Sequence, residues 1–116
     1  MRRKKKPPEP RVRRAGDWLF EAHRRRERFA PLPEDLAPRS IDEAYAVQDC
    51  FVALRAEELG PVAGHKIGLT TPQMRKMCGI DRPIAGVMLE PLIRRSPARL
   101  RAADYVHLLI EFEIAV

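Results

Sequence analysis

Two glutamates separated by one residue are the pair of side chains in this chain best suited to chemistry. Glu111 and Glu113 lie in the run Leu108–Val116, whose other members are all apolar. Successive side chains of a strand point to opposite faces, so a strand here would place both carboxylates on one face. Buried carboxylates need compensation of their charge, which a hard divalent cation such as Mg²⁺ or Mn²⁺ supplies. The pair therefore predicts half of a metal site, with a half-solvated strand bearing two surface glutamates as the alternative.

A lysine placed between two glycines is the second candidate for chemistry. The residues Val62–Thr70 predict a short strand in which Gly64, Lys66 and Gly68 share one face. The two glycines leave space beside the ammonium group of Lys66. Such a space suits an anionic substrate or a proton transfer, and the alternative is an ordinary surface lysine near a glycine bulge.

Two helices are expected before these strands. Asp17 is a candidate cap for a first helix, which we predict from Trp18 to about Phe29. The residues Ser40–Glu43 form a capping box that predicts the start of a second helix. Gly60, followed by Pro61, predicts its end. Both helices are interpreted as scaffold.

The remaining elements surround the lysine strand. Thr71 and Pro72 predict the start of a short helix that ends at Gly79 and turns Met74, Met77 and Cys78 toward the core. A further strand is predicted over residues 83–89. Residues 90–104 are expected to be irregular, and a final strand that carries the two glutamates is expected to begin at residue 105.

The basic charge of the chain belongs to its first quarter. The formal net charge of the chain is +6. Residues 1–28 hold twelve Lys/Arg and four Asp/Glu, whereas residues 29–116 hold ten Lys/Arg and twelve Asp/Glu. Residues 1–14 carry too little apolar surface to fold and are expected to form a disordered tail. This tail could touch phosphates non-specifically, but no aromatic residue interleaves its charges, so nucleic-acid binding is not the function that the sequence favours.

The composition also argues against several other classes of protein. No apolar run approaches the roughly 20 residues that a membrane span requires, and no signal-peptide core follows the basic start. Cys50 and Cys78 stand apart without a C-x-x-C pattern, so neither a zinc site nor a disulfide framework is supported. We therefore expect a protein of the reducing cytoplasm.

Four blocks of the sequence together resemble a known family. They are the stretch Asp42–Gln48 with its A-Y-x-V-Q pattern, the G-x-K-x-G-L-T strand, the loop Gly79–Pro83 and the terminal E-x-E. In their order and spacing they are similar to the 2-keto-4-pentenoate hydratases and 4-oxalocrotonate decarboxylases, within the fumarylacetoacetate hydrolase superfamily. The resemblance runs from about residue 15 to the end of the chain.

The resemblance implies an α+β fold in which N-terminal helices lead into the first strands of a mixed β-sandwich roll, here truncated. Residues 1–14 would be the basic tail, residues 15–60 the helical part, and residues 61–116 the first half of the hydratase-like β domain. It implies a lyase of aromatic-compound catabolism that hydrates a small 2-oxo dienoic acid. Full-length relatives would be homo-oligomers.

The resemblance also implies roles for four side chains. Glu111 and Glu113 would be ligands of a Mg²⁺ or Mn²⁺ ion that chelates the carboxylate and 2-oxo group of the substrate. Lys66 would be the active-site lysine, and Asp81 would lie at the rim of the same site, in place of a simple Asx turn. Such an ion would stabilise an enolate, after which water would add to the conjugated double bond.

Two features depart from the family pattern. Ile84 follows the proline of the loop, where many relatives carry an acidic residue, and this leaves the substrate and the acid-base assignment open. The third acidic metal ligand of the family would follow the E-x-E strand, so we expect an N-terminal fragment, inactive and poorly folded by itself. The alternatives are a non-catalytic fragment that folds only with a partner and a basic-tailed binding module.

Overall fold

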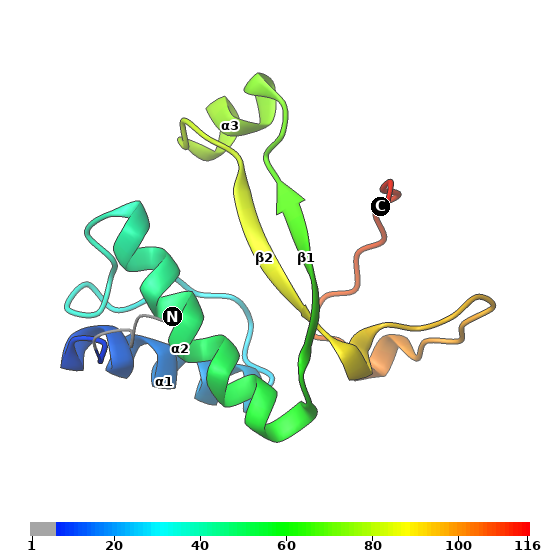
Figure 1. The fold of residues 1–116 in the computed structure, drawn as a ribbon, viewed down its shortest axis with the longest axis horizontal. Helices are drawn as coiled ribbons and strands as arrows, with labels where there is room; N and C mark the ends of the chain where they lie inside the picture. The colour runs from blue at the N-terminus through cyan, green and yellow to red at the C-terminus, as the bar shows by residue number, and fades with distance from the viewer. Residues whose placement is uncertain (1–6) are drawn as a thin grey trace, which may run out of the picture. The chain divides into compact units, whose positions relative to one another are not determined.

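The computed structural model describes residues 7–116, and they divide into two compact units. Among these residues the first unit is 7–51 with Pro97–Val116, and the second is Val52–Ser96. The first holds helix α1 and the start of helix α2, which continues into the second unit; strands β1 and β2 and helix α3 complete that second unit (Figure 1). No helix within residues 7–116 has the length and apolar character needed to cross a bilayer.

Helix α1 spans Pro10–Arg24, earlier than the sequence predicted. Pro10 occupies the first helical turn, where its missing N–H costs nothing and its fixed φ favours the helix. The predicted helix from Trp18 to about Phe29, capped by Asp17, is therefore wrong in its start and its end, since the helix stops five residues before Phe29. The helix also corrects the predicted tail of residues 1–14 from Pro10 onward, while residues 1–6 lie outside the described residues.

Helix α2 spans Ile41–Leu59 and confirms the predicted second helix. The hydroxyl of Ser40 accepts a hydrogen bond of 3.2 Å from the backbone N–H of Glu43, as a capping box requires. The chain leaves the helix at Gly60, whose φ of +134° lies in a region that L side chains rarely adopt.

The core of the first unit lies where α1 meets the beginning of α2. Val12, Ala15, Leu36 and Val47 are buried there, and other apolar side chains pack against them: Trp18, Leu19, Leu32, Ala46 and Cys50. Gly16 lets the two helices approach closely, since a Cβ at this position would lie 2.6 Å from the Cβ of Cys50. The apolar stripe of α1, with residues three and four apart, thus faces α2 and leaves Arg13 and Arg14 in solvent.

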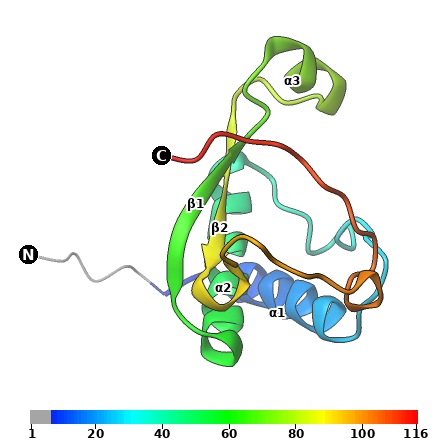
Figure 2. The same ribbon diagram turned by 90° about the vertical axis from the view of Figure 1, so that its right-hand side faces the viewer.

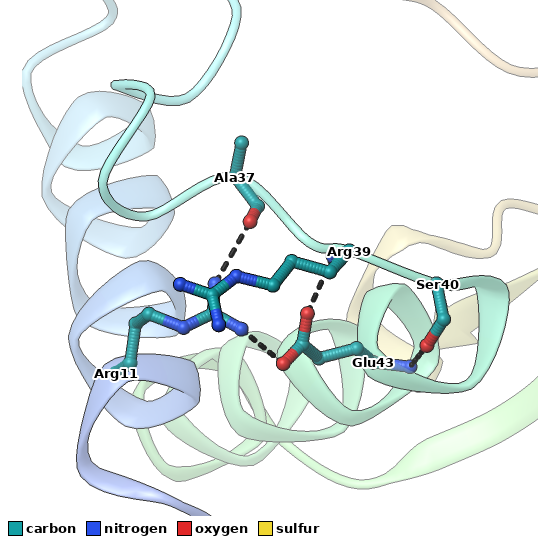
Figure 3. A network of polar contacts seen from close by, with 5 residues as sticks. All are labelled: Arg11, Ala37, Arg39, Ser40 and Glu43. Carbon is teal, nitrogen blue, oxygen red and sulfur yellow. Dashed lines mark hydrogen bonds and ion pairs between the residues drawn. The ribbon is translucent and has the colours of Figure 1, made fainter.

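A polar network fixes the same two helices at their first turns (Figure 3). The guanidinium group of Arg11 pairs with the carboxylate of Glu43 and donates a 2.8 Å hydrogen bond to the carbonyl of Ala37. The second carboxylate oxygen of Glu43 accepts from the backbone N–H of Arg39. These hydrogen bonds, chiefly the one from Arg11, hold the pKa of Glu43 below its ordinary value. One arginine of the basic N-terminal region therefore serves the fold.

The second unit is built around a hairpin whose strands were predicted. Strands β1, Val62–Gly68, and β2, Ile84–Leu89, pair antiparallel, and helix α3, Pro72–Cys78, lies at the tip of the hairpin in both views (Figures 1 and 2). The backbone N–H of Glu90 closes the base with a 2.8 Å hydrogen bond to the carbonyl of Pro61. The predicted helix after Thr71 is confirmed, but Met74, Met77 and Cys78 are exposed, so the prediction that they face the core is wrong.

The C-terminal segment differs most from its prediction. Residues 105–116 form no strand, and the Leu108–Val116 run is drawn without an arrow in Figure 2. A strand requires a hydrogen-bonded neighbour as well as alternating side chains, and in residues 7–116 the two strands of the sheet pair only with each other. Phe112 is 99% exposed, so no packing supplies what the missing pairing does not. The expected sandwich roll stays a prediction.

Candidate functional site

Lys66 lies in the middle of β1, directly opposite Gly86 of β2. Residues directly opposite each other in an antiparallel pair share a face, and so do residues two apart on one strand. The neighbours of Lys66 along its strand are Gly64 and Gly68, so three of the positions around it carry no side chain. Lys66 is exposed. The face that it shares with Gly64 and Gly68 follows from the alternation predicted for this strand, whereas the predicted cavity shared with Glu111 and Glu113 stays a prediction.

The three glycines do not leave equal space. A Cβ built on Gly64 would lie 3.0 Å from the Cε of Met88, and one built on Gly68 would lie 3.6 Å from the Cγ1 of Ile84. A Cβ built on Gly86 would meet nothing within 4 Å. The open space beside Lys66 is therefore above Gly86, with one apolar side chain on each side.

The turn that follows β1 is held by an arginine of α3. Leu69 has a φ of +56°, which is strained for a residue with a Cβ. The guanidinium group of Arg75 donates to the carbonyls of Leu69 and Thr70, at 3.2 and 3.0 Å, and so fixes this conformation. At the other end of α3, Gly79 adopts a φ of +68° and turns the chain toward β2. These contacts set the position of Lys66 relative to the tip of the hairpin.

Asp81 lies in the loop between α3 and β2, in the same unit as Lys66. Its carboxylate accepts two hydrogen bonds from the adjacent Arg82, at 2.8 and 3.3 Å, and 78% of its side chain is exposed. The hydrogen bond from Arg82 and its positive charge hold the pKa of Asp81 below its ordinary value. Asp81 is therefore a charged carboxylate at neutral pH, suited to orienting a group rather than to donating a proton.

Glu111 and Glu113 lie in the irregular C-terminal segment of the first unit, and both are exposed. Residues 7–116 contain no group of three or more histidine, cysteine, aspartate or glutamate side chains placed to hold a metal ion. A Mg²⁺ ion takes six oxygen ligands, of which two carboxylates would supply a minority. The arrangement described here therefore does not fit a closed metal site, and the predicted proximity of these glutamates to Lys66 stays a prediction.

The structure adds one residue that sequence reasoning missed. The importance of Gly86 depends on its register opposite Lys66, which no local pattern of the sequence specifies. A cavity of about 320 Å³ also lies in the first unit, between residues 18–30 and residues 105–107. None of Lys66, Asp81, Glu111 or Glu113 lines this cavity.

Comparison with known proteins finds partial relatives. The chain is 29% identical to a TodF product hydratase of Pseudomonas putida over 104 residues, which are 90% of this chain and 39% of that protein. It is 33% identical to a 2-keto-4-pentenoate hydratase of Paraburkholderia phymatum, covering 84% of this chain and 37% of that protein. A 2-oxo-hept-4-ene-1,7-dioate hydratase of Escherichia coli is 31% identical, over 84% of this chain and 36% of that protein.

The similarity covers only part of each relative. The chain spans less than two fifths of the length of these curated relatives. No family model matches the chain. The resemblance inferred from the sequence motifs is confirmed, as a partial match to the N-terminal part of these proteins.

Proposed function

Because the chain is similar to the N-terminal part of 2-keto-4-pentenoate hydratases and related hydratases, we propose that it contributes the lysine-bearing part of a hydratase. The reaction would add water across a carbon–carbon double bond of a small 2-oxo acid, with no change of redox state. The observation that carries the proposal is the position of Lys66 on β1, next to an open space above Gly86. This space and charge fit a small carboxylate.

Lys66 has two roles open to it in such a reaction. Its ammonium group can hold the carboxylate or the 2-oxo oxygen of the substrate, which orients the double bond for attack by water. It can also move a proton to or from the carbon chain, as a lysine beside a reacting carbon does in other enzymes. Both roles require the substrate to lie on the glycine face of the hairpin. We therefore place substrate binding on this face.

Asp81 would serve the rim of the same site. Its charge is already balanced by Arg82, so the pair presents both an acceptor and a donor next to β2. An exposed ion pair of this kind adds little stability to the fold. The pair would orient a water molecule or a polar group of the substrate.

The divalent metal of the resemblance remains a separate proposal that involves Glu111 and Glu113. Because the arrangement of these side chains in residues 7–116 does not complete a site, we route no step of the reaction through a metal. Titration with Mn²⁺ tests the assignment directly. Paramagnetic broadening of amide signals should centre on residues 110–114 and disappear when Glu111 and Glu113 are both changed to glutamine. Broadening centred on other acidic residues would remove the assignment.

The role of Lys66 is tested by ligand affinity. The probe is 2-oxopentanoate, a saturated acid that cannot be hydrated, and the measurement is calorimetric titration of the 116-residue chain. Lys66→Met should weaken binding by about tenfold or more, because a charged hydrogen bond contributes about 1.5–3 kcal/mol. Lys76→Met is the matched control, since Lys76 is an exposed lysine on α3, and it should leave the affinity unchanged. Equal affinities for both variants and the wild type would contradict the assignment.

Turnover gives the second readout. The chain is incubated with 2-keto-4-pentenoate and Mg²⁺, and loss of the vinyl proton signals is followed by nuclear magnetic resonance. Hydration that depends on Lys66 would support a complete hydratase activity. A chain that binds the acid through Lys66 and leaves it unreacted would contribute binding alone, which is the non-catalytic alternative.

A further inference from the structure

We propose that Gly86 determines which acids the site accepts, because it keeps open the space that the carbon chain of the ligand occupies beside Lys66. This inference rests on the proposed function and adds a residue to it. It assigns the ligand as a small carboxylate with an apolar chain. The ammonium group would take the carboxylate, and the carbon chain would lie across the face of the hairpin above Gly86.

The pairing of β1 with β2 defines which residues surround Lys66 on its face of the hairpin. Lys66 is paired with Gly86, and on the same face Gly64 is paired with Met88 and Gly68 with Ile84. The face therefore consists of a single cation, three bare backbone positions and two apolar side chains. A cation next to apolar walls is suited to an acid whose other end is hydrocarbon.

The space above the three glycines is unequal, and only one of them leaves room for a ligand. Met88 and Ile84 already reach over Gly64 and Gly68, at 3.0 and 3.6 Å from a Cβ built on each. Only at Gly86 among these three would an added Cβ project into open space. A side chain at Gly86 would therefore take room from a ligand and not from the protein.

The backbone gives no other reason for a glycine at this position. The glycines with positive φ are Gly60 and Gly79, so Gly86 has a conformation that alanine can adopt. Glycine within a strand is less stable than alanine, because it loses more conformational freedom on folding. A residue that costs stability and fills no structural need is best explained by the space that it leaves.

The test compares ligand affinity with stability in the same variant. Gly86→Ala should keep or raise the melting temperature of the chain and weaken the binding of 2-oxopentanoate by about tenfold or more, since one methyl group that displaces a bound carbon chain can have effects of this size. Binding of pyruvate, which has a shorter carbon chain, should weaken less. Ala85→Val adds bulk at the neighbouring position, which points to the opposite face with Ile67, and should leave both affinities unchanged.

Two outcomes would overturn the inference. The first is a Gly86→Ala chain that binds 2-oxopentanoate as the wild type does while Lys66→Met loses binding, which would leave the proposed function intact. The second is a Gly86→Ala chain whose melting temperature falls by several degrees, which would show that the glycine serves the fold. If Lys66→Met also binds like the wild type, the proposed function fails together with this inference.

Discussion

The helical first unit and the hairpin of the second unit use their side chains in opposite ways. The helices bury Val12, Ala15, Leu36 and Val47 in a shared core. In residues 52–96, all of which are described, Leu89 is the one buried residue. The hairpin therefore gains little stability from its own packing, although it carries the lysine of the candidate site.

The charged groups of the two regions differ in the same way. Arg11 is held by Glu43 and by the carbonyl of Ala37, so its charge is used to fix α1 against α2 (Figure 3). Lys66 is an exposed residue of β1 with glycines on both sides along its strand and opposite it on β2. Functional residues are commonly placed where local stability is low. The comparison teaches that the basic residues near the N-terminus include structural ones, and that the single lysine of β1 is the functional candidate.

The largest difference in the free energy of unfolding should appear when one leucine of each unit is changed to alanine. Leu36→Ala should lower the free energy of unfolding by about 2–3 kcal/mol, because it leaves a cavity in the helical core. Leu92→Ala, at a position that is 55% exposed in the second unit, should lower it by less than about 1 kcal/mol. Circular dichroism during urea unfolding measures both. Equal losses would contradict the division between the two regions.

A smaller loss of stability is expected when the pH is lowered, and it should come from the contacts of Glu43 between α1 and α2. Folding lowers the pKa of Glu43 below its ordinary value of 4.5, so its contacts stabilise the fold fully above that pH and lose this contribution as the pH falls through the folded-state pKa. Glu43→Gln should therefore destabilise the chain at neutral pH, and its difference from the wild type should shrink in acid. Glu57→Gln, an exposed position on the same helix, is the control. A difference that stays constant from neutral pH into acid would show that the charge of Glu43 contributes nothing.

The smallest of these effects should appear in the hairpin loop. The pKa of Asp81 is also lowered from its ordinary value of 3.8, so the sign of the pH dependence is the same and its contribution is lost in acid. Because 78% of the Asp81 side chain is exposed, solvent screens the pair with Arg82. Asp81→Asn should shift the urea midpoint less than Glu43→Gln does at neutral pH. A larger shift would mean that the loop supports the fold.

The sequence predicted the elements that local signals define. The capping box at Ser40, the Thr71–Pro72 start and the glycine stops placed α2, α3 and both strands correctly. The start of α1 was missed because Pro10 was assigned to a tail when it occupies the first turn of a helix. The strand expected over Leu108–Val116 failed because alternation cannot supply the neighbouring strand that pairing requires.

The features of the candidate site can be separated in the same way, into those that the local sequence predicts and those that require the structure. The glycine flanks of Lys66 are adjacent in sequence and could be predicted. Its partner Gly86 lies across the hairpin and depends on the register of two strands, which is a non-local property. The exposure of Asp81 and its pair with Arg82 likewise required the structure, because a loop sequence does not specify which neighbour a carboxylate binds.

Mapping of 2-oxopentanoate binding over the whole chain tests the central claim most directly. Backbone amide shifts are recorded during a titration of the chain with this acid. The account predicts that the largest shifts occur at Lys66, Gly86 and their neighbours on β1 and β2, while the core residues of α1 and α2 remain unchanged. Shifts concentrated instead on residues 18–30 and 105–107, which line the cavity of the first unit, would contradict it.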